Sequence, residues 1–151
     1  MESIVRAVGV LAAGVAIGVQ VGGAVLARPA AATGPDCGGG SAGFVAVASE
    51  QRGLERMAVG GERARISLEF VKVSEGIYGF ARIGGGTRRA DQVWLDWSST
   101  GGDGWARCGP FRVTGAGEAA ASAGWVATDE PERVMRACGR VDDVVRCTDW
   151  Y

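Results

Sequence analysis

The sequence contains no histidine, and this absence narrows the chemistry open to the protein. The Ser-His-Asp and Cys-His systems need an imidazole as general base, and the common zinc sites use it as a ligand. Carboxylates remain, but a glycosidase built on them needs two across a cleft. Most acidic residues here lie in predicted turns, where aspartate bonds backbone amides. We therefore expect no enzymatic activity, no cofactor and no metal site.

Positive charge is not concentrated anywhere along the chain. The 16 basic and 17 acidic residues give a net charge of −1, and Lys72 is the single lysine. Nucleic-acid-binding proteins normally gather basic side chains into a surface that faces the phosphates. The sequence therefore predicts that nucleic acid is not a partner.

The first 32 residues have the pattern of a secretory signal peptide. A basic group near the start is followed by an uncharged apolar run over 7–26, and Ala30-Ala31-Ala32 fits an A-x-A cleavage signal. The alternative is an uncleaved membrane anchor, because the run approaches the roughly 20 residues that cross a bilayer. We expect 1–32 to be a cleaved signal peptide and 33–151 to be a single secreted β domain without a membrane segment.

All four cysteines lie after the predicted cleavage point, and an even number in a small exported domain usually means disulfides. The spacings lack a C-x-x-C pair, which argues against a metal site. If Asp142-Asp143 forms the tip of a two-residue hairpin, Cys138 and Cys147 face each other as a non-hydrogen-bonded pair within disulfide distance. This predicts a Cys138–Cys147 disulfide and leaves Cys37–Cys108 as the second.

Most of the remaining chain has the pattern of short strands joined by turns. The segment 65–70 alternates apolar and polar residues, 92–97 does so again, and Gly84-Gly85-Gly86 interrupts the pattern between them. Roughly seven or eight such segments predict an all-β fold, a small antiparallel sandwich or barrel stapled by two disulfides. The acidic run 129–132 has potential calcium ligands, but a solvated acidic loop is the favoured interpretation.

The five tryptophans all lie in the second half of the chain. Exposed indoles offer flat faces to sugar rings and to protein partners. In the segment 92–97, alternation places Trp97 on the apolar side of the strand and Trp94 and Asp96 on the opposite side. We expect Trp97 and Trp105 to pack in the core, and Trp94 with Asp96 to form an exposed binding surface.

Two sets of residues resemble known proteins. The stretch 98–105 resembles a degenerate Asp-box, the hairpin motif of sialidases and other β-propellers, through Ser98, Gly102 and Trp105. That motif is structural in those proteins, so the resemblance implies a β-hairpin. The cysteine contexts resemble small secreted proteins of actinobacteria whose function is uncharacterised, which implies export and disulfides. These contexts are Cys108-Gly109-Pro110-Phe111, Arg136-Ala137-Cys138-Gly139 and Cys147-Thr148-Asp149-Trp150.

Taken together, these features predict a secreted, non-enzymatic binding domain whose partner is an extracellular protein or a cell-wall glycan. A secreted protease inhibitor is the main alternative, because exported inhibitors of similar size also carry two disulfides, although the wide gap between Cys37 and Cys108 does not reproduce their two local loops. A small hydrolase that uses carboxylates is the less favoured alternative.

Overall fold

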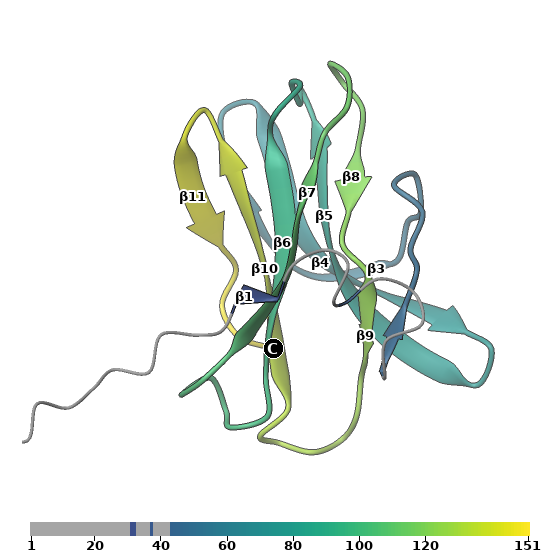
Figure 1. Cartoon of the computed structure of the whole chain (residues 1–151). Helices are drawn as coiled ribbons and strands as arrows, with labels where there is room; N and C mark the ends of the chain where they lie inside the picture. The colour runs from purple at the N-terminus through teal and green to yellow at the C-terminus, as the bar shows by residue number, and fades with distance from the viewer. Residues whose placement is uncertain (1–30, 33–36, 38–42) are drawn as a thin grey trace, which may run out of the picture.

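The computed structural model describes residues 31–32, 37 and 43–151, and these residues form two packed β-sheets (Figure 1). The described residues contain no helix, and so none that could span a membrane. The strands are β1 (Ala31–Ala32), β2 (Phe44–Val45), β3 (Leu54–Gly60), β4 (Ala64–Val73), β5 (Gly76–Gly85), β6 (Gln92–Ser98), β7 (Ala106–Arg112), β8 (Ala120–Ala121), β9 (Gly124–Val126), β10 (Val134–Val141) and β11 (Val144–Cys147).

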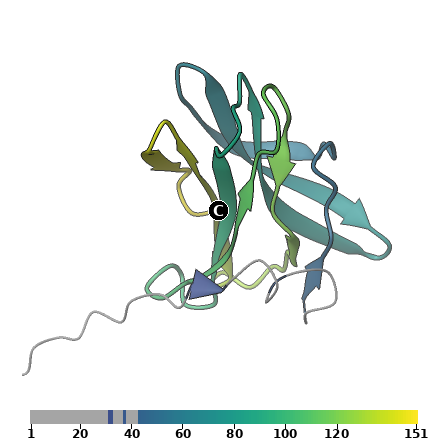
Figure 2. The same ribbon diagram turned by 45° about the horizontal axis from the view of Figure 1, so that its top comes forward.

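The first sheet has the strand order β1-β7-β6-β10-β11, and the second has the order β2-β9-β5-β4-β3 with β8 paired to β5. Every pairing is antiparallel except that between β1 and β7. The predicted all-β sandwich is therefore confirmed. Figure 2 shows the same sheets from a second direction, with the turn end of the β4–β5 hairpin projecting from the sandwich.

The predicted signal peptide, 1–32, lies outside the described residues apart from Ala31 and Ala32. These two residues form β1, in register with Arg107 and Cys108 of β7. Cleavage before Thr33 would remove this short strand from the edge of the first sheet.

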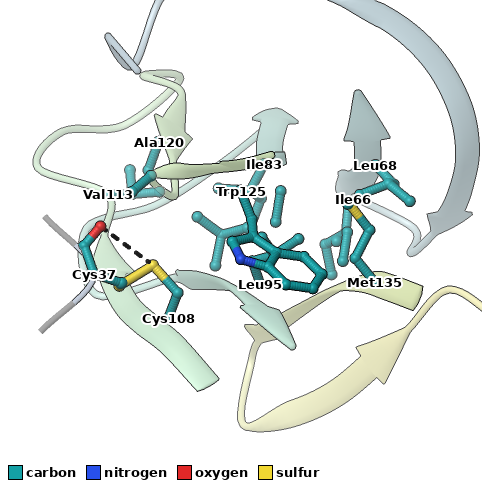
Figure 3. Close-up of a cluster of buried hydrophobic side chains, with 14 of the residues drawn as sticks. Cys37, Ile66, Leu68, Ile83, Leu95, Cys108, Val113, Ala120, Trp125 and Met135 are labelled. Atoms are coloured by element: carbon teal, nitrogen blue, oxygen red, sulfur yellow. Dashed lines mark hydrogen bonds between the residues drawn. A yellow bond between two sulfur atoms is a disulfide. The ribbon is translucent and has the colours of Figure 1, made fainter. Parts of the chain in front are cut away.

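The core lies between the sheets and follows from the alternation within each strand. Ile66 and Leu68 of β4 point inward toward Leu95 of β6, and all three are buried. Trp125 of β9 lies at the centre of the cluster, close to Leu95 and Met135 (Figure 3). Because strand side chains alternate between faces, the residues between these inward-facing ones point to the outer faces of the sheets.

Both predicted disulfides are present. Cys37 is bonded to Cys108 and Cys138 to Cys147, with Cα–Cα distances of 5.5 and 4.0 Å. The β10–β11 hairpin has the predicted register, from Val141 opposite Val144 to Cys138 opposite Cys147. Its two turn residues, both aspartates, have φ angles of 50° and 62°. Two positive φ angles define the type I′ turn, whose twist matches that of the strands.

Arg63, between β3 and β4, joins loops of both sheets through hydrogen bonds. Its Nη1 donates to Asp91 Oδ2 at 2.7 Å and its Nη2 to Asp91 Oδ1 at 3.0 Å. Its Nε and Nη2 also donate to Asp142 in the β10–β11 turn, at 3.2 and 2.9 Å. Asp91, which precedes β6, is buried. The hydrogen bond from Arg63 holds the pKa of Asp91 below its ordinary value, although burial opposes this shift.

Replacing Asp91 by asparagine is expected to lower the free energy of unfolding by about 1–3 kcal/mol at neutral pH, because a buried charge-assisted hydrogen-bond pair is lost. Since the pKa of Asp91 is lowered by folding, its contribution is present above the unfolded carboxyl pKa of roughly 3.9 and is lost as the pH falls through the folded value. The free energy of unfolding, measured in urea, should therefore be higher for the wild type than for Asp91→Asn at neutral pH, and this difference should become smaller in acid. Asp149→Asn changes an exposed carboxylate and serves as the control. A difference in unfolding free energy of the same size at neutral pH and in acid would contradict this account.

Candidate functional site

The two residues predicted to form a binding surface, Trp94 and Asp96, lie on the outer face of β6 but are buried. Trp94 is 3% exposed and Asp96 is 0% exposed. The alternation of the strand was predicted correctly, because Val93 and Leu95 face the core. The prediction that Trp94 is exposed is wrong. Neither side chain is accessible to a ligand in this structure.

Side chains from the neighbouring strands cover Trp94. The guanidinium of Arg107, on β7, lies over the indole with its Cζ 4.5 Å from the ring centroid. Cys138 of β10 is the register partner of Trp94 on the other side. Gly109 of β7 comes so close that a Cβ there would lie 2.8 Å from Trp94 Cβ, and its φ of +125° also favours glycine. The outer face of the strand is therefore closed by a second layer of side chains.

Asp96 holds this layer together. Its Oδ1 accepts a hydrogen bond from Arg107 Nε at 3.0 Å, and its Oδ2 accepts one from Arg136 Nη2 at 3.0 Å. Arg136 in turn lies over the rings of Trp105 and Trp150, at 5.0 and 4.5 Å from their centroids. We call this set, together with Trp94, the Asp96 cluster. Its charged and aromatic groups contact one another, which makes it a stabilising element of the sheet.

The other tryptophan predictions have mixed outcomes. Trp97 packs against the core as predicted, with its ring centroid 4.8 Å from that of Trp125. The prediction that Trp105 packs in the core is wrong, because it lies in the Asp96 cluster with its ring centroid 6.1 Å from that of Trp150. Trp105 follows the loop that joins β6 to β7, and this connection is the hairpin that the Asp-box resemblance implied.

One group of potential metal ligands occurs in the part of the chain that the structure describes. It consists of Asp96, Cys138 and Cys147, whose ligand atoms lie within 4.8 Å of one another. The two sulfur atoms are bonded to each other in a disulfide. A metal would need deprotonated thiolates, so the oxidised protein offers a single carboxylate at this position.

The best candidate for a binding site is a groove around Tyr151, which we call the Tyr151 groove. It consists of two adjoining hollows of about 230 and 370 Å³. Tyr151 is placed there by backbone hydrogen bonds with Met135, from Tyr151 N to Met135 O at 2.9 Å and from Met135 N to Tyr151 O at 3.0 Å. The Tyr151 ring lies 5.2 Å from that of Phe70 on β4. Both hollows are lined by Phe70, Ala127, Thr128, Asp129 and Tyr151.

Large apolar side chains are exposed along this groove. Leu54 is 59% exposed, Ile77 is 53% exposed and Tyr151 is 50% exposed. Asp129 and Glu130, of the acidic run 129–132, are exposed and line the smaller hollow. Arg133 lines the same hollow, with its Nη1 4.0 Å from Glu130 Oε1, and Arg56 and Lys72 line the larger hollow. The groove thus combines exposed apolar side chains with charged groups of both signs.

Sequence reasoning missed this groove, although it noted the acidic run 129–132. Leu54 begins β3, Ile77 follows the β4–β5 turn and Tyr151 follows β11, so three distant segments build it. Nothing in the local pattern distinguishes these three apolar residues from those of the core. The structure supplies the distinction, because it leaves them without a covering layer.

Comparison of the chain with known protein families, with curated proteins and with solved structures finds no match. The resemblance to small secreted actinobacterial proteins therefore stays a prediction.

Proposed function

We propose that this chain is a secreted, non-enzymatic binding domain that binds an extracellular protein through the Tyr151 groove. One observation carries the proposal. Among the described residues, three of the five large hydrophobic side chains that are exposed line this groove, namely Leu54, Ile77 and Tyr151. Single exposed apolar residues are ordinary, whereas several around one hollow with a polar rim are typical of interaction sites.

The composition of the groove favours a protein segment over a sugar. Leu54 and Ile77 line the same hollow as the Tyr151 ring, and such aliphatic walls favour an apolar side chain over sugar hydroxyls that would lose hydrogen bonds to water. Asp129 lines both hollows and forms no ion pair with a described residue, so it attracts positive charge, whereas Glu130 is already paired with Arg133. The partner segment that fits best presents an apolar side chain beside a lysine or arginine.

The two disulfides support the extracellular part of the proposal. Both pairs of cysteines are oxidised, and no described cysteine is free. Disulfides persist in oxidising compartments and are rare in the cytosol. The two disulfides are therefore consistent with a partner that is bound outside the cell.

Selection from a display library of short random peptides tests the proposal. The wild-type protein is expected to enrich peptides that carry an apolar residue next to a basic one. Ile77→Asp should weaken binding of a selected peptide by about 30-fold, because truncating or charging a central contact residue typically costs about 2 kcal/mol. Fluorescence anisotropy with a labelled peptide measures the dissociation constant.

Val144→Asp is the matched control, because Val144 is 48% exposed on β11 and lies outside the Tyr151 groove. This variant should bind the selected peptide as tightly as the wild type. Failure to enrich any peptide, or an equal loss in both variants, would overturn the proposal. If the wild type bound a cell-wall glycan and Tyr151→Ala did not, the partner of the groove would be a sugar and not a protein.

A further inference from the structure

Another hollow, of about 210 Å³, lies on the outer face of the second sheet. It shares no lining residue with the two hollows of the Tyr151 groove. Arg82 of β5 is in register with Ser67 of β4 and with Ala121 of β8, so its neighbours across the sheet are small. A Cβ on Gly84 would lie 2.8 Å from Arg82 Nη1. The guanidinium therefore lies directly against Gly84, in space that only glycine leaves open.

Arg82 is buried without a partner among the described residues. It is 8% exposed, its Nε has no hydrogen-bond acceptor, and the guanidinium makes no ion pair there. Burial lowers the pKa of Arg82 and the nearby charge of Arg52 lowers it further, whereas the charge of Glu69 raises it. An unpaired buried charge opposes folding strongly, so such groups are normally paired or hydrogen-bonded.

The two carboxylates that line the hollow already have other partners. Glu69 accepts hydrogen bonds from Gly53 N and from Ser67 Oγ, both at 2.8 Å. Glu55 forms an ion pair with Arg65 at 2.6 Å. Three arginines and two glutamates line the hollow, which leaves positive charge in excess at Arg52 and Arg82.

We propose that Arg82 and Arg52 bind an oxyanion in this hollow, carried by a phosphate or a carboxylate group. A guanidinium can donate two parallel hydrogen bonds to either group, and such charge-assisted bonds are strong. The hollow is far larger than the share of about 30 Å³ that one water molecule occupies, so a group of this size fits. Bound there, the oxyanion supplies the acceptor that Arg82 lacks within the described chain.

Thermal unfolding with inorganic phosphate or with acetate, at constant ionic strength, tests the proposal. One or both anions are expected to raise the unfolding midpoint of the wild type by a few degrees, with a saturable dependence on concentration. Arg82→Met should abolish the rise, and Arg52→Gln should weaken the apparent affinity by about fivefold. Arg112→Gln changes an exposed arginine of the first sheet and should keep the full response. A rise with only one of the anions identifies the group that the site binds.

The stability of Arg82→Met without either anion gives a second readout. Because this variant removes an unpaired buried charge, it should unfold at or above the wild-type midpoint. A lower midpoint for the variant, together with no effect of either anion on the wild type, would show a purely structural arginine and overturn the proposal. Equal rises in the wild type and in Arg82→Met would show anion binding elsewhere and overturn it as well.

Discussion

Asp96→Ala is expected to lower the free energy of unfolding by about 3 kcal/mol, because it removes the buried carboxylate that pairs with two arginines. Asp96 is fully buried, so the variant leaves both guanidiniums without their acceptor. The side chains of Arg107 and Arg136 are 35% and 22% exposed. Both can therefore turn toward water, which keeps the loss at the lower end of the range for broken buried pairs.

Urea unfolding followed by fluorescence measures this effect, and Asp103→Ala is the control. Asp103 is an exposed aspartate of the β6–β7 loop, so its replacement should change stability by less than about 0.5 kcal/mol. The near-ultraviolet circular dichroism of Asp96→Ala should also change, because Arg136 is no longer held against Trp105 and Trp150. A loss below about 1 kcal/mol with an unchanged spectrum would show that the Asp96 cluster contributes little to stability.

Removing the Cys37–Cys108 disulfide in the double variant Cys37→Ala/Cys108→Ala is expected to lower the free energy of unfolding by about 4 kcal/mol. The bond joins residues 71 positions apart, and in the chain-entropy model a longer closed loop restricts the unfolded chain more. Both cysteines also belong to the buried core, so truncation to alanine adds to the loss. Because small domains are stable by only about 5–15 kcal/mol, this variant should be close to unfolding at 37 °C.

The matched comparison is Cys138→Ala/Cys147→Ala, which opens a loop of 9 positions. The same model predicts a loss of about 2.5 kcal/mol for this variant. Urea unfolding of both variants under non-reducing conditions gives the two losses directly. If the short-loop variant lost more stability than the long-loop variant, constraint of the unfolded chain would not be the main contribution of these disulfides.

The β10–β11 hairpin and its disulfide could be predicted because the information is local. A two-residue turn fixes which residues face each other, and Cys138 and Cys147 lie at equal distances from Asp142-Asp143. Once this pair is assigned, Cys37 and Cys108 remain as the second. The all-β class could likewise be predicted, since alternation with a period of two is a local property of strands such as β6.

The candidate sites could not be predicted in this way. Alternation correctly put Trp94 on the outer face of β6, but it does not report what covers that face. The cover consists of Arg107, from the next strand, and Cys138 of β10, far along the sequence. The opposite holds for the Tyr151 groove. Its apolar residues look like core residues in the sequence, but they remain exposed in the fold.

The amino-acid sequence by itself therefore determined the all-β class, the register of one hairpin and the Cys138–Cys147 disulfide, since each depends on spacing along a short piece of chain, and Cys37 and Cys108 then remained as the second pair. Only the tertiary structure decided which outer surfaces meet solvent. Exposure depends on long side chains that neighbouring strands bring from distant positions, such as the two arginines over Asp96. The same reason applies to Arg82, whose Nε is buried without an acceptor among the described residues, because this burial arises only when β3, β4 and β5 are assembled into one sheet.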